Sequence, residues 1–293
     1  MATFSTTTHA AVIAEVWGDK ILPAREAPRI ISKRCLRIID DITLGDIIHL
    51  PNVANIAAGN VSSDGTTTST ANTETDTTVT VNQWRSVGID VPLNVWRQSG
   101  AYDLAAMYAP KLGYGVAIDI EDQLFDLDTA TAITTSGGAT QGTDGNGLGD
   151  VEITAALAVL DNAEVPDEDR SFMFHGNVLR DLRRIDKFTG SWSTGENPGA
   201  VATGRIGGQG KPSILLNFMG MVYGYPAWRS SRLNSGTSGR KNWLLQKEAI
   251  ALALQKDISI SELPVPRLAK HIVADAMFGT GVTRGDHAVI LLS

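Results

Sequence analysis

The chain has 293 residues, of which 43% are hydrophobic and 19% charged, and its formal net charge is −7. The length is sufficient for one large domain or two modest ones, and a charged fraction below the roughly 25% of an average globular protein favours a subunit that buries surface against neighbours. The acidic balance argues against a dedicated nucleic-acid binder, whose footprint would be basic.

The sequence carries few signals of compartment. Cys35 is the single cysteine, so an intrachain disulfide is excluded and a reducing compartment fits. The start, "MATFSTTTHAAVIAEVW", lacks the charged beginning and unbroken apolar run of a signal peptide. No stretch approaches the roughly 18 apolar residues of a membrane span, so we expect no membrane partner.

Residues 1–46 are predicted to form an N-terminal arm. Apolar residues within 8–27 predict one short helix, which cannot bury a face alone. Basic residues then follow at four-residue spacing, namely Arg25, Arg29, Lys33 and Arg37, although Pro28 disfavours a continuous helix through them. We interpret this run as a solvated or neighbour-paired face. The alternative is contact with packaged nucleic acid or another acidic partner.

From Ile47 to Val95 the hydrophobic period is two, which predicts strands. A threonine-rich tip interrupts the pattern, and it returns with a one-sided apolar row from Val79 to Val95. Each arm of about 20 residues would reach some 60 Å at roughly 3.3 Å per residue, against a radius of gyration of about 19 Å for a compact chain of this length. Because an isolated ribbon is marginal in water, we expect this excursion to lie on another subunit.

A long helix is predicted from 102 to 128, roughly 40 Å at 1.5 Å per residue. Its apolar stripe includes Leu112, Ile120 and Leu124, and Pro110 with two nearby glycines predicts a bend or weak point. Three carboxylates lie at i, i+3 and i+7, namely Asp119, Asp122 and Asp126. A solvated helix face is favoured over a metal site because no histidine is near. A Gly/Thr-rich link follows.

The region from Val151 predicts a small α+β domain. A helix with Asp150 as N-cap is followed by the strand "RSFMFH" and by a second helix capped by Asn177. Between helix and strand lies "DNAEVPDEDR", which contains five acids. We assign it to an exposed turn, because a general acid–base pair needs a cleft that perturbs its pKa values.

Sequence motifs of catalysis and cofactor binding are absent. The five histidines show no HxxxH or HxH spacing, no G-x-S-x-G occurs, and "TGRIGGQGKPS" departs from the phosphate-loop pattern. Tryptophans such as Trp84 are interpreted as core or interface anchors. We therefore assign no catalytic, cofactor-binding or metal-binding residue. The inter-subunit contact candidates are Arg25, Arg29, Lys33, Arg37, Trp84, Asp119, Asp122 and Asp126.

The order of these parts resembles the major capsid protein of tailed bacteriophages, the Hong-Kong-ninety-seven-like fold. "SGAYDLAAMYAPKLGYGVAIDIEDQLF" is similar to the family's spine helix, and "LAVLDNAEVPDEDRSFMFHGNVLRDL" to its helix, P-x-x-x-R turn, strand and second helix, with Pro166 and Arg170 in place. "GYPAWRSSRL" is similar to the G-x-P-x-x-x-S strand, and "LLQKEAIALALQK" and "FGTGVTRGDHAVILL" to the closing elements. The resemblance covers nearly the whole chain.

The fold implied by this resemblance is α+β. Its parts would be an N-terminal arm at 1–46, an extended β-loop at 47–97, a peripheral domain with the spine helix at 98–150, an axial domain at 151–268 with strands returning to the peripheral domain, and a C-terminal return segment at 269–293.

The implied function is self-assembly of pentamers and hexamers into an icosahedral shell around double-stranded DNA. The alternative keeps the fold as an encapsulin-like compartment for a protein cargo, and a third hypothesis is a hydrolase that uses the carboxylates of the long helix. The implied partners are further copies of the chain, a portal protein, a separate scaffolding protein, a decoration protein and non-specifically packaged DNA. The expected location is the virion, after assembly in the host cytoplasm, and no cofactor is implied.

In such a shell the basic arm could face the lumen or pair with a neighbour's long helix at Asp119, Asp122 and Asp126. We favour the neighbour, because an arm without its own core needs fixed contacts to be ordered.

Overall fold

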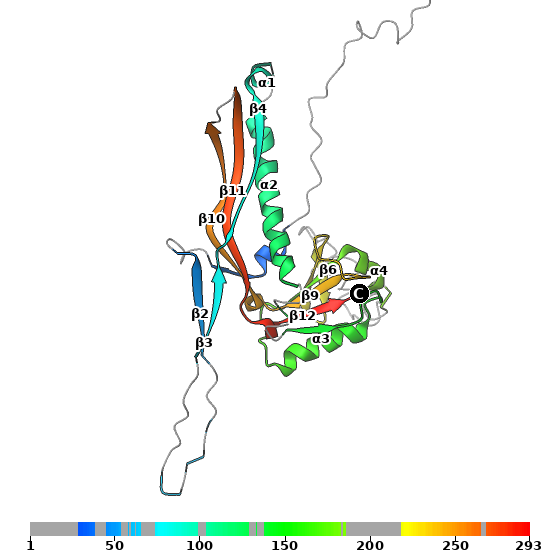
Figure 1. Ribbon diagram of the computed structural model, residues 1–293. Helices are drawn as coiled ribbons and strands as arrows, with labels where there is room; N and C mark the ends of the chain where they lie inside the picture. The colour runs from blue at the N-terminus through cyan, green and yellow to red at the C-terminus, as the bar shows by residue number, and fades with distance from the viewer. Residues whose placement is uncertain are drawn as a thin grey trace, which may run out of the picture.

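The computed structural model describes residues 29–38, 45–53, 74–98, 104–128, 138–182, 184–185, 218–264 and 268–293, with positions 58, 60, 61, 63–65 and 133 between them. The helix expected within 8–27 lies outside these ranges. The strands of the described residues form a four-stranded, a six-stranded and a two-stranded sheet (Figure 1).

The four-stranded sheet carries the long helix. Its order is β1-β10-β11-β4, with bounds β1 (Leu36–Ile38), β10 (Ile250–Pro264), β11 (Ala269–Val282) and β4 (Gln83–Pro92). β10 and β11 form a long antiparallel hairpin, β4 pairs antiparallel with β11, and β1 pairs parallel with β10. The helix α2 (Leu104–Phe125) runs along this sheet, and the short α1 (Leu93–Gln98) lies at its far end (Figure 1).

The predicted long helix is confirmed, but no break occurs at its proline or glycines. α2 continues through Pro110 to Phe125, and the short 3-10 turn η2 (Asp126–Asp128) follows. A methyl group at Gly113 would lie 3.7 Å from the Ile260 side chain, and one at Gly115 would lie 3.5 Å from that of Val87. The glycines therefore face the sheet at a distance where a methyl group would make ordinary van der Waals contact.

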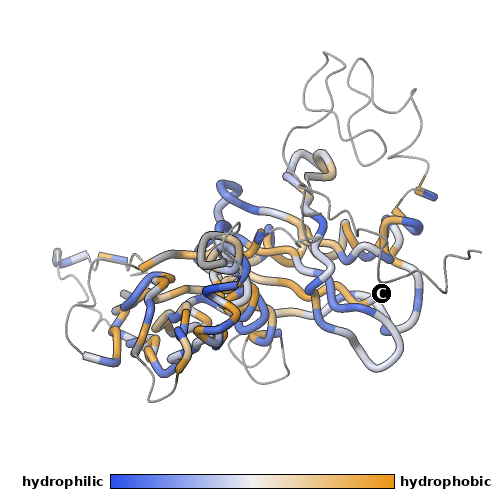
Figure 2. The backbone as a smooth tube through the Cα atoms, turned by 90° about the horizontal axis from the view of Figure 1, so that it is seen from above, coloured by the Kyte–Doolittle hydropathy of each residue, from blue (hydrophilic) through white to orange (hydrophobic). Residues whose placement is uncertain are grey.

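The six-stranded sheet has a helix on one side and the end of α2 on the other. Its order is β5-β12-β9-β6-β8-β7, with bounds β5 (Ala139–Gln141), β12 (Ala288–Leu292), β9 (Lys241–Leu245), β6 (Ser171–His175), β8 (Tyr225–Ser230) and β7 (Phe218–Val222). Phe172 and Phe174 belong to the cluster that includes buried residues of α3 (Asp150–Asn162). Met173, between them, belongs to the cluster that includes buried residues of α2. Strand alternation thus places both faces of β6 in cores, and Figure 2 shows hydrophobic residues following neighbouring strands through the middle of the molecule.

The strands of the C-terminal half are divided between the two larger sheets. β10, within the range 151–268, pairs in the four-stranded sheet, and the range 269–293 supplies β11 to one sheet and β12 to the other. The strands between residues 250 and 293 therefore connect the four-stranded sheet to the six-stranded sheet.

The two-stranded sheet is shorter than the predicted excursion. β2 (Ile47–Val53) pairs antiparallel with β3 (Glu74–Thr80), from Ile47↔Thr80 to Val53↔Glu74. The returning strand was expected to continue to Val95, but β4 pairs with β11 instead. Val79 and Val81 are buried against Ala251 and Ala253 of β10, so the chain's own core covers the base of this hairpin.

Two predicted helix caps are wrong by one or two residues. Gly149, not Asp150, is the N-cap of α3, and its N–H donates to Glu152 Oε2 at 3.0 Å. Asp150 is the first helical residue, where its charge suits the helix dipole. After β6, the cap of the turn η3 (Gly176–Val178) is His175, whose Nδ1 accepts from the Asn177 N–H at 3.1 Å. The short α4 (Leu179–Leu182) follows.

The acidic stretch after α3 is an exposed turn, as predicted, built around a buried arginine. The Arg170 side chain is 2% exposed; its Nη1 lies 2.6 Å from Asp161 Oδ1 and 3.2 Å from Asp167 Oδ1. Its Nε donates to the Pro166 carbonyl at 3.0 Å, and Nη2 donates to the Val165 carbonyl. Two of the five acids thus balance a buried cation, whereas Glu164, Glu168 and Asp169 are exposed.

Two buried histidines make this part of the fold sensitive to acid. Burial lowers the pKa of His175 below 6.5, and the charge of Arg240 lowers it further. Burial likewise lowers the pKa of His287, which lies in the turn η5 (Gly285–His287). Protonated Nδ1 of His175 could no longer accept from Asn177. Because the folded state binds fewer protons than the unfolded state, the stabilisation is present above about pH 6.5 and is lost as pH falls through the lowered pKa values.

We therefore expect the melting temperature of the unassembled subunit to be flat from pH 8 to 7 and to fall between pH 6.5 and 5. The variant His175→Asn with His287→Gln keeps a cap acceptor but cannot titrate in this range. Its melting temperature should fall less, as thermal denaturation followed by circular dichroism would show. Identical slopes in the two proteins would contradict this assignment.

Candidate assembly interface

A buried carboxylate on α2 binds the end of the arm at residues 30–32. Glu121 of α2 is 1% exposed, and its Oε2 accepts from the N–H groups of Ile30 and Ile31 at 3.1 and 3.2 Å. Its Oε1 accepts from the Ser32 N–H at 3.0 Å and from the Ser32 hydroxyl at 2.5 Å. The carboxylate thus satisfies the donors at the start of the 3-10 turn η1 (Ile31–Lys33). Glu121 was not among the sequence candidates, because its role depends on residues about 90 positions away.

The structure describes part of the basic run of the arm. Arg25 lies outside the described residues, and Arg29 and Lys33 are exposed. Arg34 lies over the Trp228 ring, 4.5 Å from its centroid, in a cation–π contact with β8. Arg37 occupies a position on β1. Within its own chain this segment contacts α2 through Glu121 and β8 through Trp228, and its pairing with a neighbour stays a prediction.

The acidic residues of the long helix also have partners within the chain. Asp119 Oδ2 lies 3.3 Å from Arg85 Nε on β4, and Asp122 Oδ1 accepts from Arg232 Nε at 2.7 Å. The hydrogen bond to Asp122 raises the pKa of the Arg232 guanidinium. Asp126, which lies in η2 rather than on α2, accepts from Asn234 Nδ2 at 3.1 Å. A neighbour's arm would have to compete with these contacts, so its pairing with this face stays a prediction.

The ion pairs of Asp119 and Asp122 are relevant to the hypothesis of a hydrolase that uses carboxylates of the long helix. Acid–base catalysis requires two carboxylates of different pKa facing a cleft, whereas Asp119 and Asp122 each face an arginine. Among the described residues, no group of three or more His, Cys, Asp or Glu could hold a metal ion.

None of the helices in the described ranges is long and apolar enough to cross a membrane.

Trp84 is the most exposed of the candidate anchors. It lies on β4, which ends the strand order of the four-stranded sheet, and it is 74% exposed. Its indole N–H donates to Asp275 Oδ2 at 3.2 Å, and Lys256 Nζ lies 2.6 Å from the same oxygen. Hydrogen bonds from Lys256 and then from Trp84 lower the pKa of Asp275. This network fixes the indole on an open edge of the sheet, where an aromatic ring suits an interface.

The sequence finds no match among protein-family models or curated proteins, but solved structures resemble the fold closely. A chain from Mycobacterium phage Che8 has a TM-score of 0.74 at 20% identity, with 95% of this chain and 96% of that chain covered. A chain from the capsid of cyanophage P-SCSP1u has a TM-score of 0.74 at 14% identity, with 96% and 93% covered. A chain from the capsid of a native GTA particle has a TM-score of 0.70 at 11% identity, with 99% of both covered. The likeness extends over nearly the whole length of each chain, and at these identities it concerns the fold.

We expect Glu121→Ala to loosen the arm and to lower the free energy of unfolding by about 3 kcal/mol, because buried backbone donors lose a charged acceptor. The control is Asp126→Asn. It changes an exposed carboxylate near Glu121 into an amide that keeps an acceptor oxygen, and it should change the free energy of unfolding by less than about 0.5 kcal/mol. Chemical denaturation would measure both values. Limited trypsin digestion should cut after Arg29 or Lys33 faster in Glu121→Ala only. Equal digestion rates in the two variants would contradict the anchoring role.

Proposed function

We propose that this protein, which has the fold of the capsid chains described above, is the major capsid protein of a tailed phage or a related particle. It assembles into pentamers and hexamers that close an icosahedral shell around double-stranded DNA. The observation that carries this proposal is the likeness to capsid chains over 93–99% of both lengths. A fold alone does not fix a function, but here arm, hairpin, spine helix and both sheets are all included.

The surface of the molecule supports a building block rather than a free monomer. The hairpin β2–β3 extends away from both larger sheets (Figure 1). An isolated two-stranded ribbon is marginal in water, and only the base of this one packs on its own chain. We infer that its outer part lies on an adjacent subunit.

The remaining partners follow from the same proposal. A shell of this kind needs a portal for DNA entry and a scaffolding protein to set its size, and it offers sites for a decoration protein. Contact with the packaged DNA is non-specific. Assembly takes place in the host cytoplasm, and the finished subunit resides in the virion. The encapsulin-like alternative is less favoured, because the similar capsid structures described here come from a phage and from a GTA particle.

Negative-stain imaging tests the function. Expression of the chain with its neighbouring genes should give DNA-filled heads, and expression alone should give empty shells or capsomers. Smaller shells filled with protein would favour the encapsulin-like use. Dispersed monomers under both conditions would overturn the proposal.

The role of the hairpin can be tested without unfolding its base. Val53 and Glu74 are directly opposite in the pairing, so an Asn-Gly turn can replace residues 54–73 and keep the strands joined. We expect the melting temperature of the variant subunit to stay within about 2 °C, because Val79 and Val81 keep their contacts, and shell yield to fall sharply. Normal shells from this variant would contradict contact between the outer hairpin and a neighbour.

A further inference from the structure

A lysine and an asparagine share one buried carboxylate at the end of α2. Asp128 closes the turn η2, and its side chain is 0% exposed. Its Oδ1 lies 3.2 Å from Lys241 Nζ and 3.1 Å from Asn234 Nδ2. The Lys241 N–H also donates to the Asn234 carbonyl at 3.0 Å, so the two residues are neighbours on adjacent segments. One carboxyl oxygen thus contacts the nitrogens of a primary amine and of a primary amide.

The acceptors around Asn234 fix the orientation of its amide. Asn234 Nδ2 lies 3.1 Å from each of three acceptors, namely the Phe125 carbonyl oxygen, Asp126 Oδ1 and Asp128 Oδ1. A carbonyl oxygen can only accept hydrogen bonds, so the nitrogen of the amide must be on this side. The nitrogen that would leave in a substitution at Cγ therefore faces the carboxyl group of Asp128.

The surroundings of Asp128 favour its protonated form. Among the described residues its Oδ2 has no hydrogen-bond partner, and burying an ionised carboxylate with a bare oxygen is costly. Burial raises the pKa of Asp128 and outweighs the opposing effects of Asn234 and Lys241. Transfer of a proton from the Lys241 ammonium to Asp128 gives a neutral amine beside a neutral acid, and burial favours both neutral forms. A neutral amine is a nucleophile, whereas an ammonium is not.

We propose that Lys241 and Asn234 form an isopeptide bond within the chain and that Asp128 transfers the protons. Lys241 Nζ attacks Asn234 Cγ, and a C–N bond forms. Asp128 accepts a proton from Nζ and donates one to Nδ2, so the Cγ–Nδ2 bond breaks and Nδ2 leaves as ammonia. One amide replaces another, Asp128 ends in the form in which it began, and the step needs no oxidant or reductant.

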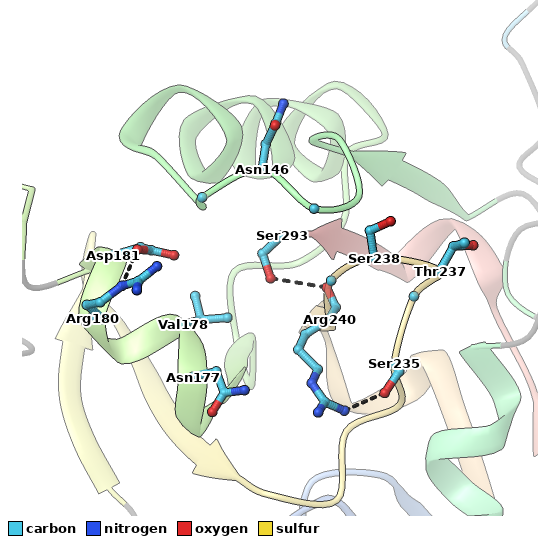
Figure 3. A pocket seen from close by; sticks show the side chains of 14 residues that line it. Asn146, Asn177, Val178, Arg180, Asp181, Ser235, Thr237, Ser238, Arg240 and Ser293 are labelled. Carbon is cyan, nitrogen blue, oxygen red and sulfur yellow. Dashed lines mark hydrogen bonds and ion pairs between the residues drawn. The ribbon is translucent and has the colours of Figure 1, made fainter.

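The bond closes the segment 234–241 into a covalent loop. Arg240 Nη1 donates to the Ser235 hydroxyl across this turn, and residues 235–240 form one wall of a polar pocket of about 450 Å³ (Figure 3). The loop joins the stretch after β8 to Lys241, the first residue of β9. A covalent loop lowers the entropy of the unfolded chain, so the bond stabilises the six-stranded sheet where η2 meets it. All reacting groups lie in one chain, so the reaction does not depend on assembly into a shell.

Mass spectrometry of the wild-type chain tests the proposal. A non-covalent cluster leaves the chain at the mass that its sequence requires, whereas the isopeptide bond lowers this mass by one molecule of ammonia. Trypsin cuts after Arg232, Arg240 and Lys247, so the digest should contain the peptide 233–240 joined to the peptide 241–247. A chain of full mass, or loss of ammonia without the joined peptides, would overturn the proposal.

Three variants test the role of each group. Lys241→Arg keeps the positive charge but has no amine that can lose a proton, and Asp128→Asn keeps the shape of the side chain without the acid. Both should retain their full mass and give no joined peptides. The matched control is Asp126→Asn, which changes the other carboxylate that contacts the Asn234 amide at 3.1 Å and should still give the joined peptides.

Melting temperatures of the three variants would show that each one folds, and the wild-type result decides the proposal without them. Joined peptides from the Asp128→Asn chain, or none from the Asp126→Asn chain, would contradict proton transfer by Asp128.

Discussion

The last turns of α2 hold the molecule together. Leu124 and Phe125 are fully buried, and the Phe125 ring meets Trp243 of the six-stranded sheet edge to face, with centroids 6.0 Å apart. Glu121, one turn earlier, receives the arm. Apolar packing fixes the position of the helix against both sheets, and the buried carboxylate is satisfied by backbone N–H groups of the arm and by the Ser32 hydroxyl.

A buried polar cluster completes this junction. Asp128 is 2% exposed, and its Oδ1 lies 3.2 Å from Lys241 Nζ and 3.1 Å from Asn234 Nδ2. Burial raises the pKa of Asp128, although Asn234 and Lys241 act against this. The cluster connects the turn η2 at the end of α2 to β9 of the six-stranded sheet, although Asp128 Oδ2 has no hydrogen-bond partner among the described residues.

Several charged side chains form ion pairs within the chain. Asp122 is paired with Arg232, Asp119 with Arg85, and Asp161 with the buried Arg170. Other groups remain exposed, among them the indole of Trp84 and the carboxylates of Glu164, Glu168 and Asp169 after α3.

Local patterns in the sequence predicted the elements that depend on local physics. The apolar spacing of Leu112, Ile120 and Leu124 predicted α2, and the acidic run before Ser171 predicted an exposed turn; both are present. The order of the elements also indicated the fold. These features follow from helical and strand periodicity, which any short window of sequence contains.

Pairing across long stretches of chain was decided only by the tertiary structure. The same alternation that places Val87 and Val91 on a strand fits a free hairpin or the edge strand of a larger sheet equally well, and only β11, about 190 residues away, decided that β4 belongs to the four-stranded sheet. Likewise, Glu121 looked like one more acid on a helix that carries several, and Arg170 like one side chain of a loop motif. A side chain's hydrogen-bond partners and burial depend on which distant segment folds against it, so the sequence alone determined the elements, and the tertiary structure decided which residues anchor them.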